Sequence, residues 1–226
     1  MYIDPLYILL SLPALLIALG AQFIVRYFYS KYSRVANSAG LNGIDVTERL
    51  ARENGLNIRL QVSLQDLVDS YNPMKKELTL SEKVAHAPSM ASVGIAAHEL
   101  GHAMQHQKGS FLLSIRTYLV PIVNLGTTLG YLLFILGFTL QVLGAMLLGI
   151  ALFSFATVFT IVTLPVEIDA SAKALKMLKG LNVFNENDLN GVRRVLFAAG
   201  FTYVASVLQS LSTLLYYVLR AFGRDD

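Results

Sequence analysis

The chain has 226 residues, 54% of them hydrophobic, and a formal net charge of +3 at pH 7. Its mean hydropathy of +0.54 is too high for a soluble domain of this length, so a bilayer is the expected environment. The absence of cysteine excludes disulfide bonds and thiolate metal ligands. The basic residues are spread over segments that flank apolar stretches, a pattern typical of membrane topology and not of nucleic-acid binding.

Four stretches are long and apolar enough to span a membrane as helices, each of which needs about 20 residues. The stretch 117–166 contains no charged residue and is too long for one span, so we expect two helices with a turn around Gly137 to Gly144. The spans are predicted at about 6–28, 117–137, 143–164 and 198–219. We therefore predict a mainly α-helical multi-pass membrane protein whose residues 1–226 form a single domain.

Two polar segments separate the outer spans from the central pair, at about 30–115 and 167–197. Both are rich in lysine and arginine, and the turn between the central spans has none, which predicts that both segments face the cytoplasm. Arg220 and Arg224, at the other end of the last span, count against this orientation. The basic residues of the two segments are Lys31, Arg34, Arg49, Arg52, Arg59, Lys75, Lys76, Lys83, Lys108, Lys173, Lys176, Lys179, Arg193 and Arg194.

The first polar segment is predicted to form a small α+β region. A short helix is expected at Ile44 to Asn54, with Asp45 or Thr47 near its start. Residues 57–62 and 76–81 alternate in hydrophobicity and are predicted to be strands. These strands either offer an edge to which an extended peptide can add or form a structural hairpin that covers the next helix.

Residues 98 to 102 read His-Glu-Leu-Gly-His, a pattern typical of zinc hydrolases. Histidines four residues apart lie one turn above the other on a helix, so His98 and His102 can reach one metal ion. A catalytic zinc has three protein ligands and leaves its fourth position to water. Glu99 is then placed to act as general base toward that water and to return the proton to the leaving amine.

A third ligand must come from elsewhere, because Gln105 and Lys108 occupy the positions where a longer form of the motif carries glycine and a third histidine. The central spans run out and back, so residue 167 returns to the side of the membrane that carries His98. A helix is predicted to begin at Glu167, with Pro165 in its first turn. Glu167 is the expected third zinc ligand.

Other residues near these positions have competing interpretations. Asp169 points from a different helical face than Glu167, so only one of the two is expected to bind the metal. Glu186, in an Asn-rich stretch, is expected in a solvated loop. His106 extends the histidine face by a turn, but three side chains along one straight helix cannot close around a tetrahedral ion. Ser171 can support a metal ligand through a hydrogen bond or lie on the helix surface.

Three runs carry a resemblance to a known family: MASVGIAAHELGHAMQ at 90–105, TLPVE at 163–167 and TYVA at 202–205. In this order they resemble the YugP-type family of bacterial membrane zinc metallopeptidases, over nearly the whole chain. The resemblance implies a HExxH peptidase with zinc held by His98, His102 and Glu167 and with Glu99 as catalytic base. The layout is also similar in outline to HtpX-like and prenyl-protein proteases, which place a glutamate ligand after a helical hairpin.

One family element departs from the pattern. The family's Asp-His-Tyr-Asp-Pro is Asp-Ser-Tyr-Asn-Pro at 69–73, so no role for its histidine or second aspartate carries over.

A hydrogen-bond donor that stabilises the oxyanion of the reaction is not assigned. The candidates are Tyr203, Arg193, Arg194 and His86.

We expect a zinc-dependent membrane endopeptidase with Zn²⁺ as cofactor, working at the cytoplasmic face of a bacterial cell membrane on polypeptides in or near the bilayer. No nucleic-acid partner is expected. A homo-oligomer or another membrane partner is left open, because small residues such as those at 144–149 allow helices to pack closely.

Two alternative functions are left open. An intramembrane protease of the site-2 type shares the first motif but pairs it with Leu-Asp-Gly on a later span, which this sequence lacks. A scaffold or quality-control adaptor with a structural zinc site has no use for a base, so the presence of Glu99 argues against it.

Overall fold

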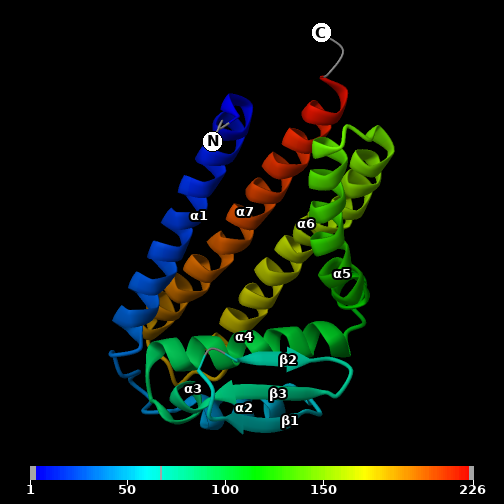
Figure 1. The fold of residues 1–226 in the computed structure, drawn as a ribbon. Helices are drawn as coiled ribbons and strands as arrows, with labels where there is room; N and C mark the ends of the chain where they lie inside the picture. Colours follow the sequence, from blue (N-terminus) through cyan, green and yellow to red (C-terminus); the bar gives the residue numbers. More distant parts are fainter. Residues whose placement is uncertain (1–3, 67, 224–226) are drawn as a thin grey trace. The chain divides into compact units, whose positions relative to one another are not determined.

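The computed structural model describes residues 4–66 and 68–223 (Figure 1). Contacts divide the chain into two compact units. The helical unit consists of Met1–Gln22, Ser114–Pro165 and Thr202–Asp226, and the mixed unit consists of Phe23–Leu113 and Val166–Phe201. Arg224, one of the two arginines weighed against the predicted orientation, lies outside the described residues.

Four helices are long and apolar enough to cross a membrane: α1 (Pro5–Tyr32), α5 (Phe111–Thr139), α6 (Leu143–Gly180) and α7 (Glu186–Phe222). Each contains one of the predicted spans, and residues 140–142 form the turn between α5 and α6 as expected. The predicted fold class, a mainly α-helical multi-pass membrane protein with a small α+β region, is therefore confirmed. Whether the whole chain acts as a single domain stays a prediction.

Glycines bring α5 and α6 together in the helical unit. A Cβ on Gly149 would lie 2.6 Å from the backbone nitrogen of Phe134, so any larger residue would force the two helices apart. Phe134 also stacks on Tyr217 of α7, with ring centroids 3.9 Å apart. Gly149 therefore serves a contact within the chain, and the idea that the 144–149 stretch joins a second subunit stays a prediction.

The helix predicted to begin at Glu167 does not exist as a separate element. Instead, α6 runs unbroken from Leu143 to Gly180 with Pro165 inside it. The proline removes one backbone hydrogen bond, but the apolar run before it and the alanine-rich run after it both favour helix, so one lost bond does not end the element. Similarly, α7 begins at Glu186, which makes this exposed residue part of a first helical turn and not of a loop.

The mixed unit contains a three-stranded sheet and three shorter helices. These elements are α2 (Gly43–Glu53), β1 (Arg59–Ser63), β2 (Ser70–Asn72), β3 (Glu77–Ser81), α3 (Glu82–His86) and α4 (Met90–Gln107). The helix α2 starts at Gly43 because Asn42 caps it. The Asn42 side chain accepts a hydrogen bond from the Asp45 amide, and the Asp45 carboxylate accepts one from the Asn42 amide.

The sheet has the order β1-β3-β2, with β1 parallel and β2 antiparallel to β3. The two predicted strands correspond to β1 and β3, but the idea that they form a hairpin is wrong, because they are parallel. The hairpin is made by β2 and β3, and Asn72 shapes its turn by accepting hydrogen bonds from the amides of Met74 and Lys75. A strand of three residues such as β2 is too short to leave a hydrophobic alternation in the sequence.

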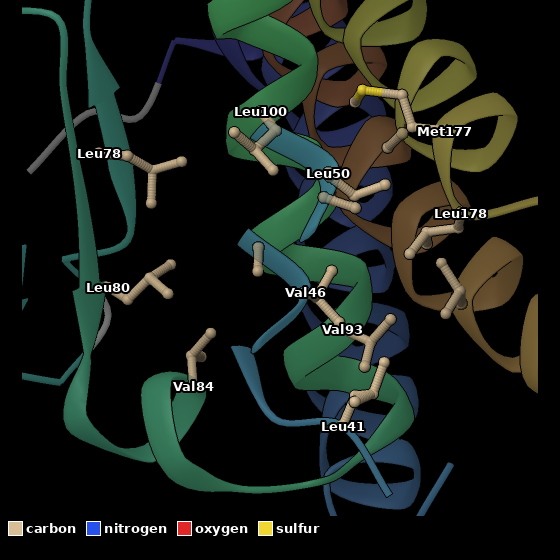
Figure 2. Close-up of a cluster of buried hydrophobic side chains, with 14 of the residues drawn as sticks. Leu41, Val46, Leu50, Leu78, Leu80, Val84, Val93, Leu100, Met177 and Leu178 are labelled. Carbon is tan, nitrogen blue, oxygen red and sulfur yellow. The ribbon is translucent and has the colours of Figure 1, made fainter. Parts of the chain in front are cut away.

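A buried apolar cluster packs α4 against its neighbours in the mixed unit (Figure 2). Leu78 and Leu80, on the inner face of β3, and Leu100 of α4 are each 0% exposed. Leu178, from the end of α6, belongs to the same cluster and is also fully buried. Full burial of one such side chain contributes about 1.5–3 kcal/mol. The helix that carries the two histidines is thus held by the sheet, by α2 and by α6.

Gly101 sets how closely α4 and α6 approach. A Cβ at this position would lie 2.4 Å from the backbone oxygen of Ala170 and 3.1 Å from its Cα. These are backbone atoms, which cannot turn aside as a flexible side chain can. Only glycine at 101 is compatible with this separation of the two helices.

We therefore expect Gly101→Ala to destabilise the mixed unit, because the added methyl group overpacks the contact with α6. Overpacking of this kind costs about 1–3 kcal/mol, which thermal unfolding of the purified chain would detect as a lower Tm. Gly200→Ala is the matched control, since Gly200 is also helical and a Cβ there meets nothing within 4 Å. Equal Tm values for the two variants would contradict the close approach.

Candidate active site

The helix α4 presents His98 and His102 on one face. Ser89 caps its N-terminus by accepting a hydrogen bond from the Ser92 amide at 3.1 Å, and the helix then continues for 18 residues. The two imidazole rings lie one turn apart, with centroids separated by 4.8 Å and planes inclined at 85°. The shared face predicted from their spacing is therefore present.

Glu167 of α6 faces both histidines. Its Oε2 lies 3.1 Å from His98 Nε2, and its Oε1 lies 3.6 Å from His102 Nε2. One ligand atom from each of the three side chains can be chosen so that all lie within 4.8 Å of one another. Two histidines of α4 and a carboxylate of α6, which lies 69 positions after His98 in sequence, thus come together at one point.

The donor set fits a zinc ion. Two neutral imidazoles and a carboxylate are ligands that zinc accepts readily, and the set leaves a coordination position open for water. The Glu167 side chain is 1% exposed, and an ionised carboxylate so far from water is costly without a compensating positive charge. A cation among the three donor atoms would supply this charge.

The three side chains differ in their access to solvent. The His98 side chain is 15% exposed, whereas those of His102 and Glu167 are 8% and 1% exposed. A molecule from solution would therefore reach the group on the His98 side. Glu99, the predicted base, follows His98 on α4 and is itself 9% exposed.

A second layer of polar groups contacts the outer nitrogen of each histidine. Ser171 Oγ lies 3.2 Å from His98 Nδ1, so its predicted supporting role agrees with its position. Gln105 Oε1 lies 3.0 Å from His102 Nδ1. In the sequence, Gln105 stands out only as a departure from a longer motif, and its contact with His102 was not predicted. The spacing of three residues from His102 on the same helix was the available signal.

Asp169 does not join the metal-ligating group, in agreement with its predicted helical face. Its carboxylate accepts a hydrogen bond from Gln105 Nε2 at 2.7 Å and forms an ion pair with Lys173. Burial raises the pKa of the Asp169 carboxyl. The hydrogen bonds from Lys173 and Gln105 and the positive charges of Lys173 and Lys108 outweigh burial and hold this pKa below its ordinary value. Asp169 is therefore ionised at neutral pH.

The other residues considered for a role in the site make different contacts or are exposed. His106 Nδ1 is 2.9 Å from the hydroxyl of Tyr71 on β2, which ties α4 to the sheet. Burial raises the pKa of the Tyr71 phenol, so this hydroxyl stays protonated at neutral pH. Arg193 donates a hydrogen bond to Asn190, one turn earlier on α7. His86, at the end of α3, and Arg194 are exposed, and Tyr203 belongs to the helical unit.

Comparison with known proteins gives a match over almost the whole chain. The family described as "Putative neutral zinc metallopeptidase" matches residues 7–222. A protein of Bacillus subtilis (strain 168) named "Putative membrane protease YugP" is 39% identical over 223 residues, which are 98% of this chain and 99% of that protein. No solved structure matches the chain. Since the match takes in both α4 and the part of α6 that carries Glu167, the chain belongs to this family of membrane zinc metallopeptidases.

Proposed function

We propose that this chain is a zinc-dependent endopeptidase that cleaves membrane or membrane-proximal polypeptides at the cytoplasmic face of a bacterial membrane. His98, His102 and Glu167 would hold the zinc, and Glu99 would be the general base. One observation carries this proposal, namely the convergence of two imidazoles and a buried carboxylate, with donor atoms within 4.8 Å of one another. Two histidines, a glutamate and an open position are the ligand set of many zinc peptidases.

The chemistry divides between the metal and the chain. A bound zinc supplies Lewis acidity, which lowers the pKa of water and polarises a carbonyl group. Glu99 takes the proton from the attacking water and later gives it to the leaving amine nitrogen, so that the bond between carbonyl carbon and nitrogen can break. A neutral amine leaves far more readily than an amide anion, which is why this transfer is needed.

The sheet offers a way to select extended polypeptide. β1 and β2 are its edge strands, and Tyr71 of β2 is joined to α4 through the hydrogen bond with His106. A peptide that adds to β2 as a further strand would run beside the helix that carries the two histidines, held by main-chain hydrogen bonds. Folded proteins cannot present their backbone in this way, so unfolded or extended segments are the favoured substrates.

Replacement of the base tests the mechanism. We expect Glu99→Gln to retain about one zinc per chain and to lose about 10²–10⁴-fold in peptidase activity on an unfolded fluorescent polypeptide, because the amide cannot accept the proton. His98→Ala should lose both zinc and activity. Glu48→Gln, which changes an exposed glutamate of α2, is the control and should match the wild type in both measurements.

These variants also separate the alternatives. Full activity in Glu99→Gln would contradict the proposed mechanism, and the absence of zinc from the wild type would contradict the metal site. Bound zinc without measurable activity in any wild-type preparation would favour the scaffold with a structural metal. Cleavage only within the hydrocarbon-spanning part of a membrane substrate would favour an intramembrane protease.

The orientation can be tested with single cysteines, because the natural chain has none. We expect Leu64→Cys, at a position 87% exposed in the mixed unit, to react with a membrane-impermeant maleimide only after the cells are opened. Leu140→Cys, at a position 70% exposed in the turn between α5 and α6, should react in intact cells. The reverse labelling pattern would refute a cytoplasmic site.

A further inference from the structure

Gln105 lies beside the metal-ligating group, and both polar atoms of its side chain have hydrogen-bonding partners. The residue is 1% exposed. Its Nε2 donates hydrogen bonds to the backbone oxygen of Val166 at 2.8 Å and to the carboxylate of Asp169 at 2.7 Å. These two bonds use both hydrogens of the amide nitrogen. The remaining polar atom, Oε1, lies 3.0 Å from Nδ1 of His102.

The surroundings of the amide fix which end faces His102. If the amide turned over, its oxygen would face the carbonyl oxygen of Val166, which can only accept hydrogen bonds, and the Asp169 oxygen that accepts from the amide nitrogen in the present arrangement. Such an arrangement would lose two hydrogen bonds and bring oxygen lone pairs together. Lys173 forms an ion pair with Asp169, which keeps that carboxylate beside the amide nitrogen.

An amide oxygen can only accept, so Nδ1 of His102 must carry a hydrogen. In a neutral imidazole the lone pair is then on Nε2, the atom that faces Glu167. A metal ligand has to offer this lone pair. The contact at His98 is different, because the Ser171 hydroxyl can donate or accept and therefore leaves the tautomer of His98 undetermined.

Gln105 also connects α4 to α6, through residues that lie on either side of Glu167 in the sequence. Its partners on α6 are Val166, the residue before Glu167, and Asp169, two residues after it. The close approach at Gly101 brings these groups within reach of a side chain from α4. One amide thus orients a ligand of one helix and holds the segment that carries the ligand of the other.

We propose that Gln105 is a positioning residue of the metal site, which keeps the hydrogen of His102 on Nδ1 so that the lone pair of Nε2 can bind zinc. This inference rests on the proposed zinc site, but the state of the ring can be tested without metal. Without Gln105, Glu167 Oε1 still lies 3.6 Å from Nε2 and favours a hydrogen on that side of the ring. The hydrogen would then move to the ligand atom and would have to leave before a metal could bind.

The direct test is nitrogen NMR of the full chain in detergent, with ¹⁵N-labelled histidine and all metal removed. The protein has only four histidines, so single substitutions assign the signals. We expect Nδ1 of His102 to be protonated in the wild type and in Gln107→Met. In Gln105→Met the hydrogen should be on Nε2. Gln107 is the matched control, because it lies on the same helix, is exposed and donates to Gly55.

Zinc affinity gives the second measurement, by competition with a chelator. Loss of a group that orients a metal ligand weakens binding by about 10–100-fold, which we expect for Gln105→Met and not for Gln107→Met. An unprotonated Nδ1 in the wild type would overturn the proposal even if the variant failed to fold, as would unchanged His102 signals and affinity in a folded Gln105→Met. If the wild type bound no zinc, the proposed function would fail, while the NMR result would still decide the role of Gln105.

Discussion

The candidate site depends on the close approach of α4 and α6 at Gly101 and Ala170. A methyl group at residue 101 would lie 2.4 Å from a backbone oxygen of α6, so the separation of the helices leaves no room for any side chain. One turn on either side of this contact, short polar side chains reach from helix to helix. Glu167 reaches His98 and His102, and Gln105 reaches Val166 and Asp169. A wider gap would break all of these contacts together.

This constraint gives the apolar hairpin of α5 and α6 a role beyond anchoring the chain. The hairpin begins soon after the motif helix ends and leads the chain back at Glu167, so α6 supplies both a membrane span and a carboxylate. The buried cluster of the mixed unit, which includes Leu100 and Leu178, holds the two helices against the sheet and α2. The polar site is built on a rigid apolar support, as a preorganised metal centre requires.

Local patterns in the sequence were sufficient to predict the four spans, the helix with its histidine pair, the strands β1 and β3, and Glu167 as the returning carboxylate. Each of these follows from length, periodicity or spacing. The unbroken course of α6 through Pro165 was missed because the proline was taken to mark a helix start, whereas the helical preference of the other residues of this 38-residue helix outweighs its effect. The strand β2 and the role of Gln105 depend on partners far along the chain. Two of the three hydrogen bonds of Gln105, to Val166 and Asp169, reach α6, and spacing along α4 does not reveal them.

A metal site shared by α4 and α6 is tested most directly by X-ray absorption at the zinc edge on the purified full chain, compared with Glu167→Ala. We expect nitrogen and oxygen ligands at about 2.0–2.2 Å, with the outer-shell scattering of two imidazoles, and one protein ligand fewer in the variant. A spectrum with three or four imidazoles, or an identical spectrum for Glu167→Ala, would contradict a metal site formed jointly by α4 and α6.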